Sequence, residues 1–188
     1  MLFIFDFDST LAELNVDWST VKKEVLDYAE SIGAKTDPST HLVNISNNIS
    51  ENEETKKEVD RIFRKHESRA TKEGNFLVYP STVPTLNALR ERGHKTAIAS
   101  NNNEETIREV VKVGKLPVDA IRGRNSVSRP KPFPDMLNSL MEELQTPKNE
   151  TFMTGDNFWD EGSGKAAGVK TFIIKPGTLD ISLFDGII

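Results

Sequence analysis

Apolar runs recur along most of the chain, and helical patterns or turn residues separate them. Residues 2–5 are apolar without a break, which is typical of a strand buried on both faces. Similar runs predict further strands at residues 95–99, 118–121, 151–154 and 169–174. Helical spacing of apolar positions predicts helices between them at residues 82–92, 104–113, 134–144 and 159–167. Strands that alternate with helices predict a parallel sheet with right-handed crossovers.

Residues 14–79 follow a different pattern, with helical spacing and no clear strand. Asp17 is a plausible N-cap for a first helix, which Gly33 would end. The apolar face of this helix is expected to consist of Val21, Val25, Tyr28 and Ile32. Residues 37–49 predict a weak second helix, and residues 51–73 predict a long, charged third helix.

These patterns predict an α/β fold with two parts. Residues 1–13 and 80–188 would form a Rossmann-like parallel sheet core flanked by helices. Residues 14–79 would form a small all-helical cap inserted after the first strand, with residues 11–16 as a linker. Ser81 or Thr82 would cap the helix that follows the insertion. The tail beyond residue 174 is apolar enough to dock on the core, but its pattern predicts no position for it.

Composition narrows the class of protein. The chain has 188 residues and a formal net charge of −5, which argues against a dedicated nucleic-acid binder. It contains no cysteine, so disulfides and cysteine-ligated zinc are excluded. The first apolar run is too short for a membrane span or a signal sequence. We expect a soluble cytoplasmic protein without nucleic-acid or membrane partners, and the composition leaves the oligomeric state open.

Two carboxylates follow the first predicted strand directly. Asp6 and Asp8 are separated by Phe7, so they start on the same side of an extended chain. A buried strand ends in charge only where its end opens into a polar site, because an unpaired buried carboxylate is costly. Ligands of open α/β sheets bind outside the carboxyl ends of the strands. The cap would be inserted just after this strand end, where it could serve as a lid over the site.

The other predicted strands also end in polar groups. These groups are Ser100 and Asn101, Lys131 in the following loop, and Asp156 with Asp160 four residues later. Each one alone is typical of a turn, a solvated charge or the first turn of a helix. At one edge of a parallel sheet they can converge. Acids that hold Mg²⁺, a lysine, a hydroxyl and an attacking carboxylate are what metal-assisted phosphoryl transfer requires.

In these motifs the chain resembles the haloacid dehalogenase-like hydrolase superfamily. The matching segments are Asp6-Phe7-Asp8-Ser9-Thr10, Ser100-Asn101, Lys131 in a Pro-rich loop, and Gly155-Asp156 with Asp160. All four occur in order, in the expected strand context, and together they cover nearly all of the predicted core. The resemblance is strongest to the phosphoglycolate-phosphatase-like branch, which has a helical cap between the first two motifs. Tyr79-Pro80 also fits this branch.

The resemblance implies a phosphatase that works through an aspartyl-phosphate. Asp6 would attack the phosphorus, and Asp8 would protonate the leaving alcohol and then deprotonate the hydrolytic water. Mg²⁺ would be held by the carboxylate of Asp6, the backbone carbonyl of Asp8 and the carboxylate of Asp156. The substrate would be a small phosphorylated metabolite.

The remaining motif residues would assist this reaction. The resemblance implies that Lys131, Ser100 and the adjacent Asn101 bind the phosphoryl oxygens, and that Lys131 also takes part in catalysis. Thr10 would brace the loop of the nucleophile beside the substrate. Asp160 would act from the second shell by orienting Lys131 or a water molecule on the metal.

Several alternatives remain open at this point. Ser9 replaces the glycine more usual in this branch, and the resulting Asp-x-Asp-Ser-Thr motif is also similar to that of phosphoserine phosphatases. A phosphomutase on the same scaffold needs a cap group that activates a sugar hydroxyl. A dehalogenase needs no proton donor, so the presence of Asp8 argues against it. A phospho-receiver domain normally carries its phosphorylated aspartate after a middle strand and has no helical insertion.

Overall fold

The computed structural model describes residues 1–50 and 52–188. The chain divides into two compact units. The core unit consists of Met1–Leu14 and Phe76–Ile188, and the helical unit is Asn15–Asn75. Glu51, the first residue of the predicted third helix, lies outside the described residues.

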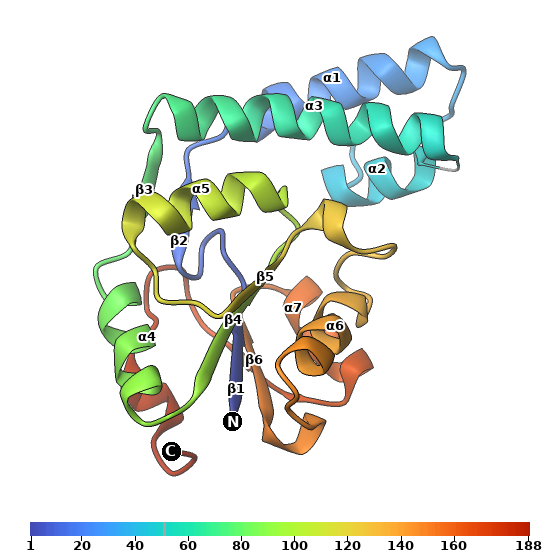
Figure 1. Cartoon of the computed structure of the whole chain (residues 1–188). Coiled ribbons are helices and arrows are strands. Elements are labelled where there is room, and N and C mark those ends of the chain that lie inside the picture. The colour runs from blue at the N-terminus through green and yellow to red at the C-terminus, as the bar shows by residue number, and fades with distance from the viewer. Residues whose placement is uncertain (51) are drawn as a thin grey trace. The chain divides into compact units, whose positions relative to one another are not determined.

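The core unit is built on the predicted parallel sheet (Figure 1). Its five strands lie in the order β5-β4-β1-β6-β7, and every neighbouring pair is parallel. The strands are β1 (Leu2–Phe5), β4 (Lys95–Ala99), β5 (Ala120–Arg122), β6 (Thr151–Gly155) and β7 (Lys170–Ile173). The predicted α/β fold is confirmed. Because all five strands are parallel, their carboxyl ends lie at one edge of the sheet.

Helices cover both faces of this sheet (Figure 1). They are α4 (Thr82–Glu91), α5 (Glu104–Gly114), α6 (Asp135–Glu143) and α7 (Phe158–Ala167), with short 3₁₀ turns η1 (Arg124–Ser126), η2 (Lys148–Glu150) and η3 (Ile181–Phe184). α6 and α7 lie on one face, while α4, α5 and η3 lie on the other. Alternate residues of β1 serve the two faces, as expected for a central strand. Leu2 and Ile4 pack with the apolar side of α6, whereas Phe3 and Phe5 point to η3.

The C-terminal tail completes the second face. Phe184 in η3 is fully buried, and its ring centroid lies 4.8 Å from that of Phe3 and 5.7 Å from that of Phe172. Burying one such side chain contributes about 1.5–3 kcal/mol. The tail that the sequence pattern left unplaced is therefore part of the core.

The last strand differs from its prediction. The apolar run at residues 169–174 predicts a buried strand, but Lys170 and Ile173 in β7 are exposed. Among the residues that the structure describes, β7 pairs with β6 alone, and it forms one edge of the sheet. An apolar run shows that a segment is extended, but it does not show how many neighbours the strand will have.

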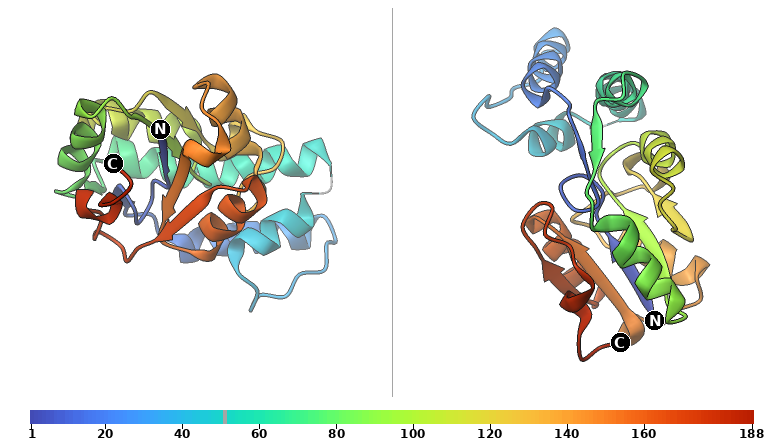
Figure 2. Two further views of the ribbon diagram at one scale, coloured as in Figure 1. Left: turned by 90° about the horizontal axis from the view of Figure 1, so that it is seen from below. Right: turned by 90° about the vertical axis from the view of Figure 1, so that its left-hand side faces the viewer.

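Two short strands were missed in the sequence. β2 (Ala12–Leu14) and β3 (Phe76–Val78) form a separate antiparallel ribbon, in which Ala12 lies opposite Val78 and Leu14 opposite Phe76. Figure 2 shows the two strands running side by side. The prediction of a linker at residues 11–16 and of no strand in residues 14–79 is wrong here. Three residues are too few for an alternating pattern, and the partners lie far apart in the chain.

The helical unit contains α1 (Trp18–Ser31), α2 (Leu42–Ile49) and α3 (Glu53–Lys72). Asp17 caps α1 as predicted, because its carboxylate accepts the backbone N–H groups of Ser19 and Thr20. Ile32 is exposed instead of lying on the buried face. The buried core of this unit is formed by Val21, Val25, Ala29, Ile45, Ile49, Val59, Ile62 and Phe63.

One predicted helix start is shifted, and another lies where it was predicted but without the expected side-chain cap bond. α2 begins at Leu42 after the N-cap His41, while Asp37 accepts the N–H of Ser39 in a turn before it. At α4, Ser81 occupies the N-cap position without a side-chain cap bond. Thr82 Oγ1 instead donates to the carbonyl of Leu11, 2.6 Å away. Ser81 thus stands at the predicted N-cap position without a side-chain cap bond, and Thr82 ties α4 to the loop after β1.

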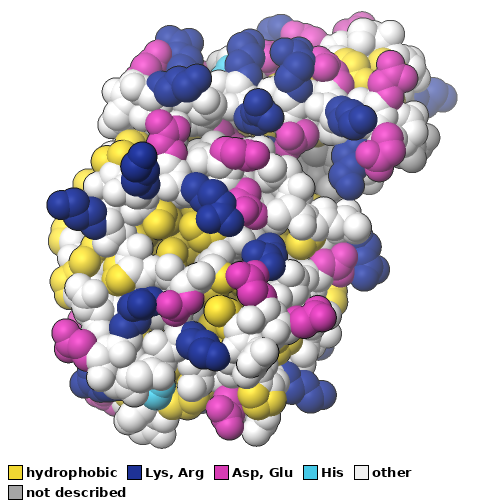
Figure 3. Space-filling view, in the orientation of Figure 1, with side chains coloured by type: hydrophobic (Ala, Val, Ile, Leu, Met, Phe, Trp, Pro, Cys, Tyr) yellow, Lys and Arg dark blue, Asp and Glu magenta, His cyan; other side chains and the backbone are white. Residues whose placement is uncertain are grey.

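Charged side chains are mixed on the surface. On the face drawn in Figure 3, lysine and arginine side chains are interspersed with aspartate and glutamate side chains. Two arginines before Lys131 are paired with acids of α6: Arg122, the last residue of β5, with Glu143, and Arg129 in the following loop with Asp135. Among the described residues, no helix combines the length and the apolar character needed to cross a membrane.

Candidate active site

The turn after β1 presents the first carboxylate at the edge of the sheet. The N–H of Asp6 donates to the carbonyl of Thr154 at 2.8 Å, so Asp6 continues the pairing with β6 by one residue. Phe7 is fully buried, and its carbonyl accepts the N–H groups of Leu11 and Ala12, which closes a tight turn. Ser9 within this turn has φ = 68°, a conformation that glycine adopts without strain. This φ gives the physical reason why glycine suits this position.

Lys131 links two acids in the interior. Its Nζ lies 2.7 Å from Asp6 Oδ1 and 2.5 Å from Asp160 Oδ1. All three side chains are buried, and that of Lys131 is only 2% exposed. The second oxygen of Asp160 accepts the N–H groups of Asp156 and Asn157, at 3.2 and 3.3 Å. Because both oxygens of Asp160 have protein donors, this residue is suited to orient Lys131.

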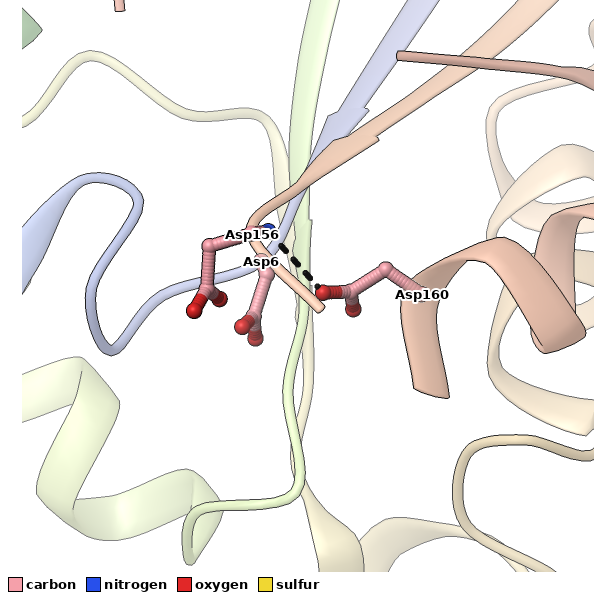
Figure 4. A group of neighbouring side chains, drawn as sticks. All are labelled: Asp6, Asp156 and Asp160. Carbon is pink, nitrogen blue, oxygen red and sulfur yellow. Dashed lines mark hydrogen bonds between the residues drawn. The ribbon is translucent and has the colours of Figure 1, made fainter. Parts of the chain in front are cut away.

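A third carboxylate completes the acidic group. Asp156 follows β6 directly, and Figure 4 shows it pointing, with Asp6 and Asp160, into a common space. One oxygen of each of these three carboxylates lies within 4.8 Å of the others. Asp156 Oδ1 also accepts from Asn157 Nδ2 at 3.0 Å. The residues come from the ends of β1 and β6 and from the first turn of α7.

The electrostatics of this group follow from burial. Burial and the nearby charge of Asp6 raise the pKa of Asp160 to about 7, against the opposing effect of Lys131. The same two causes raise the pKa of Asp156. Burial disfavours the charged form of Lys131, but Asp160 and Asp6 outweigh it, so the pKa of Lys131 is raised. Half-buried Asp156 and buried Asp6 repel each other, and their oxygen donors fit a hard divalent cation such as Mg²⁺, which would relieve that repulsion.

Asp8 lies outside the group of three carboxylates. Its Oδ1 accepts the N–H of Leu14, the last residue of β2, at 2.8 Å. The side chain is half-buried. The structure thus holds the predicted proton-transfer carboxylate against the ribbon, two residues along the chain from the predicted nucleophile.

The predicted phosphate-binding residues lie in one loop system. Asn101 Nδ2 donates to the carbonyl of Lys131 at 3.0 Å, so its amide holds the lysine loop. Ser100 is buried, and its Oγ donates to Asn102 Oδ1 at 2.8 Å. Thr10 Oγ1 is buried without a hydrogen-bond partner among the described residues. The structure brings Asn101 and Lys131 together. Within the described part of the chain, Thr10 is bound in the turn through its backbone N–H, which donates to the carbonyl of Phe7 at 3.3 Å, and its hydroxyl makes no hydrogen bond there.

Two residues near the acids carried no predicted role in the sequence. The hydroxyl of Tyr79, just after β3, donates to Glu13 Oε2 in β2 at 3.3 Å. The pKa of Tyr79 is raised to about 12, mainly by burial. The negative charge of Glu13 is the next cause, and the charges of Asp8 and Asp156 contribute less. Tyr79 was visible in the sequence as part of Tyr79-Pro80, but its contact with Glu13 needs the β2–β3 pairing.

Comparisons with known proteins agree with this architecture. Residues 3–174 match the family described as haloacid dehalogenase-like hydrolase. Pyrophosphatase PpaX of Halalkalibacterium halodurans is 35% identical over 114 residues, which are 60% of this chain and 53% of the relative. Phosphoglycolate phosphatase of Aquifex aeolicus is 30% identical over 133 residues, or 68% of this chain and 60% of the relative. The chain thus spans about half the length of the curated relatives it matches.

The same fold occurs in solved structures. A putative haloacid dehalogenase-like hydrolase from Bacteroides fragilis superposes with a TM-score of 0.65 at 23% identity, covering 98% of this chain and 92% of that one. The family resemblance seen in the four motifs is confirmed. The family match covers most of the chain, and we conclude that this protein belongs to the haloacid dehalogenase-like hydrolase family.

Proposed function

We propose that this protein is a Mg²⁺-dependent phosphatase that hydrolyses a small, phosphoglycolate-like phosphomonoester through an aspartyl-phosphate. The observation that carries this proposal is the meeting of Asp6, Lys131, Asp156 and Asp160 at the carboxyl edge of the sheet. Relatives named pyrophosphatase and phosphoglycolate phosphatase support the chemical class. The helical unit, predicted as residues 14–79 and observed as Asn15–Asn75, would serve as the cap that selects the leaving group.

Two carboxylates would divide the reaction. An oxygen of Asp6 attacks the phosphorus while the bond to the leaving oxygen breaks, which transfers the phosphoryl group to Asp6. Asp8 donates a proton to the departing alkoxide. In the second half, Asp8 takes a proton from water, the water oxygen attacks the phosphorus, and Asp6 leaves as a carboxylate. Overall, one phosphate ester and one water molecule give one alcohol and one inorganic phosphate.

Lys131 would place a positive charge beside Asp6, the attacking carboxylate. Its ammonium contacts Asp6 at 2.7 Å and is oriented by Asp160. A cation in this position can also contact a phosphoryl oxygen next to the nucleophile. Asn101 holds the lysine loop through the Lys131 carbonyl, and Ser100 lies at the end of the neighbouring strand as a further contact for the phosphoryl group.

The acids fit a magnesium ion. The carboxylates of Asp6 and Asp156, with the backbone carbonyl of Asp8, would hold it. When bound, the ion neutralises negative charge on the phosphoryl group and the carboxylates. Asp160 has both oxygens committed to Lys131 and to backbone N–H groups, so its contribution is the orientation of Lys131.

Inorganic pyrophosphate is a second candidate substrate. The 35% identical relative is named a pyrophosphatase, and the same four groups can act on a phosphoanhydride, whose leaving group is itself a phosphate. Comparison of kcat/KM for phosphoglycolate, phosphoserine and pyrophosphate would rank these substrates. Product analysis with a hexose 1-phosphate would reveal a phosphomutase.

The nucleophile can be tested directly. Asp6→Asn should lower Mg²⁺-dependent hydrolysis of p-nitrophenyl phosphate by about a thousandfold or more, because an amide oxygen is a poor nucleophile. The matched control is Asp185→Asn, which changes an exposed aspartate of the same unit and should retain full activity. Acid-quenched protein should carry a phosphoryl group on residue 6 in the wild type and none in Asp6→Asn. An Asp6→Asn variant as active as the wild type would refute the proposal.

A further inference from the structure

The position of the Asp8 carboxylate depends on the short ribbon of β2 and β3. Asp8 Oδ1 accepts the N–H of Leu14 at 2.8 Å. Leu14 is the last residue of β2, and among the described residues β2 forms its sheet pairing with β3 alone, over three residue pairs. A two-stranded ribbon of this length is marginally stable by itself. Contacts that hold β2 to β3 therefore also hold the N–H group that anchors Asp8.

Tyr79 makes three of these contacts. Its N–H donates to the carbonyl of Leu11 at 3.1 Å, which extends the pairing beyond β3. Its hydroxyl donates to Glu13 Oε2 in the middle of β2 at 3.3 Å. Its ring lies against the C-terminal tail, where a Cβ on Gly177 would stand 3.2 Å from Tyr79 Cε1. One side chain thus joins β2 and β3 to a segment that packs on the sheet.

The phenol also lies within electrostatic reach of two of the acids. Besides burial and Glu13, the charges of Asp8 and Asp156 contribute to the raised pKa of Tyr79. All these groups belong to the core unit. The hydroxyl therefore remains protonated and remains a donor to Glu13 throughout the neutral range.

We propose that Tyr79 is a positioning residue for Asp8: by bonding Glu13 and resting on Gly177, it holds β2 in place, so that the Leu14 N–H sets the orientation of the Asp8 carboxylate. This inference rests on the proposed function, in which Asp8 transfers the proton. In this role Tyr79 acts through Glu13 and Leu14 and needs no contact with the substrate or the metal. Loss of its hydroxyl should weaken proton transfer and spare the attack by Asp6.

Leaving-group dependence separates these two effects. p-Nitrophenolate leaves as a stable anion without a proton, whereas the alkoxide of phosphoglycolate needs one. Tyr79→Phe should lower kcat/KM for phosphoglycolate about tenfold, a fraction of the hundredfold or greater contribution of a general acid, and leave kcat/KM for p-nitrophenyl phosphate nearly unchanged. The comparison uses kcat/KM because it reports the steps up to departure of the leaving group, whereas hydrolysis of the aspartyl-phosphate, in which Asp8 is the base, is common to both substrates. Glu13→Ala should give the same pattern. In an Asp8→Asn background, Tyr79→Phe should have no further effect, because the group it positions is gone.

The activity control is Asp185→Asn, an exposed residue of the core unit, because the other tyrosine of the chain, Tyr28, belongs to the helical unit proposed as the cap. Asp185→Asn should change kcat/KM for neither substrate. Equal losses of kcat/KM for both substrates in Tyr79→Phe would overturn the proposal, because they would show a general structural role. A loss from Tyr79→Phe that persists in the Asp8→Asn background would overturn it for the same reason.

A measurement without catalysis keeps the proposal independent of the proposed function. Amide hydrogen exchange at Leu14 should be faster in Tyr79→Phe than in the wild type, and unchanged in Tyr28→Phe. Unchanged exchange at Leu14 would overturn the positioning role even if the enzyme is an active phosphatase. Faster exchange in a protein that hydrolyses neither substrate would support the link to Leu14 and refute the proposed function.

Discussion

Each unit contains a cluster in which a lysine contacts carboxylates, and the two clusters show how burial changes the pKa values of these groups. In the core unit, Lys131 pairs with Asp6 and Asp160, and its side chain is 2% exposed. In the helical unit, Lys65 and His66 both contact Glu24, at 2.9 and 3.0 Å, and the Lys65 side chain is 56% exposed. The distances are similar, but only the first cluster is cut off from water.

The pKa values of the acids move in opposite directions. The hydrogen bond from Lys65 is the largest cause that lowers the pKa of Glu24, an ordinary ion-pair effect. Burial and a second carboxylate raise the pKa of Asp160 to about 7. An acid with a lowered pKa stabilises the fold, whereas a buried acid with a raised pKa costs stability. Such a cost is typical of sites where charges are gathered for chemistry.

The largest expected effect on stability comes from removing the buried lysine, Lys131. Lys131→Met should lower the free energy of unfolding by about 3–5 kcal/mol, because it leaves Asp6 and Asp160 buried without their cation. For a chain of this size, that corresponds to a fall in Tm of about 6–20 °C. Urea unfolding and thermal melts would measure it.

The matched control is Lys65→Met in the helical unit. Its exposed pair should be worth no more than about 1 kcal/mol. Equal losses in the two variants would contradict the distinction drawn between the clusters.

Stabilisation by Mg²⁺ should depend on the acids of the core unit and not on the cluster around Glu24. If Mg²⁺ binds the folded protein at the acids, a concentration of 100 Kd should raise the free energy of unfolding by about 2.7 kcal/mol. Asp156→Asn should abolish most of this gain, because it removes one of the converging carboxylates. Thermal melts with and without Mg²⁺ would measure both. Glu24→Gln should keep the full gain, and a gain that survives Asp156→Asn would place the ion elsewhere.

The smallest effect concerns pH, and its sign differs between the clusters. Because the pKa of Asp160 is raised, the folded metal-free protein binds this proton more tightly, so stability should fall as pH rises from about 4 to about 7. Each pKa unit corresponds to about 1.4 kcal/mol, and the raised pKa already includes the opposing effect of Lys131, so the change amounts to a few kcal/mol at most. Asp160→Asn should flatten this part of the profile of unfolding free energy against pH.

Glu24 should act in the opposite direction. Its pKa is lowered from 4.5, so its contribution is present above that pH and is lost as pH falls through the folded value. Glu24→Gln should therefore flatten the acidic limb only. The same sign of change in Asp160→Asn and Glu24→Gln would contradict the comparison.

Much of the core and of the candidate site could be predicted from local pattern. Four strand ends carry Asp6, Ser100, Lys131 and Asp156 at or just beyond them. The carboxyl-edge rule for parallel sheets was enough to expect convergence, and the structure brings Asp6, Lys131 and Asp156 to one place. Their roles in catalysis stay predictions.

The errors have a common cause. The β2–β3 ribbon and the bond of Thr82 to Leu11 depend on partners far away in the chain. The exposed edge position of β7 depends on the order of the strands in the sheet. A run of three residues has no readable period. Tyr79 was noticed as part of a dipeptide, but its partner Glu13 could not be named without the ribbon.

The order of apolar and polar residues by itself determined where strands and helices form, and hence which side chains stand at the edge of the sheet, because backbone periodicity is a local property. Tertiary structure decided which of these side chains touch. It placed Lys131 between Asp6 and Asp160, held Asp8 against Leu14 and buried Phe184 of the tail. Burial and hydrogen-bond geometry arise only when distant segments pack, and they are what gives a carboxylate in this protein an unusual pKa or an ordinary one.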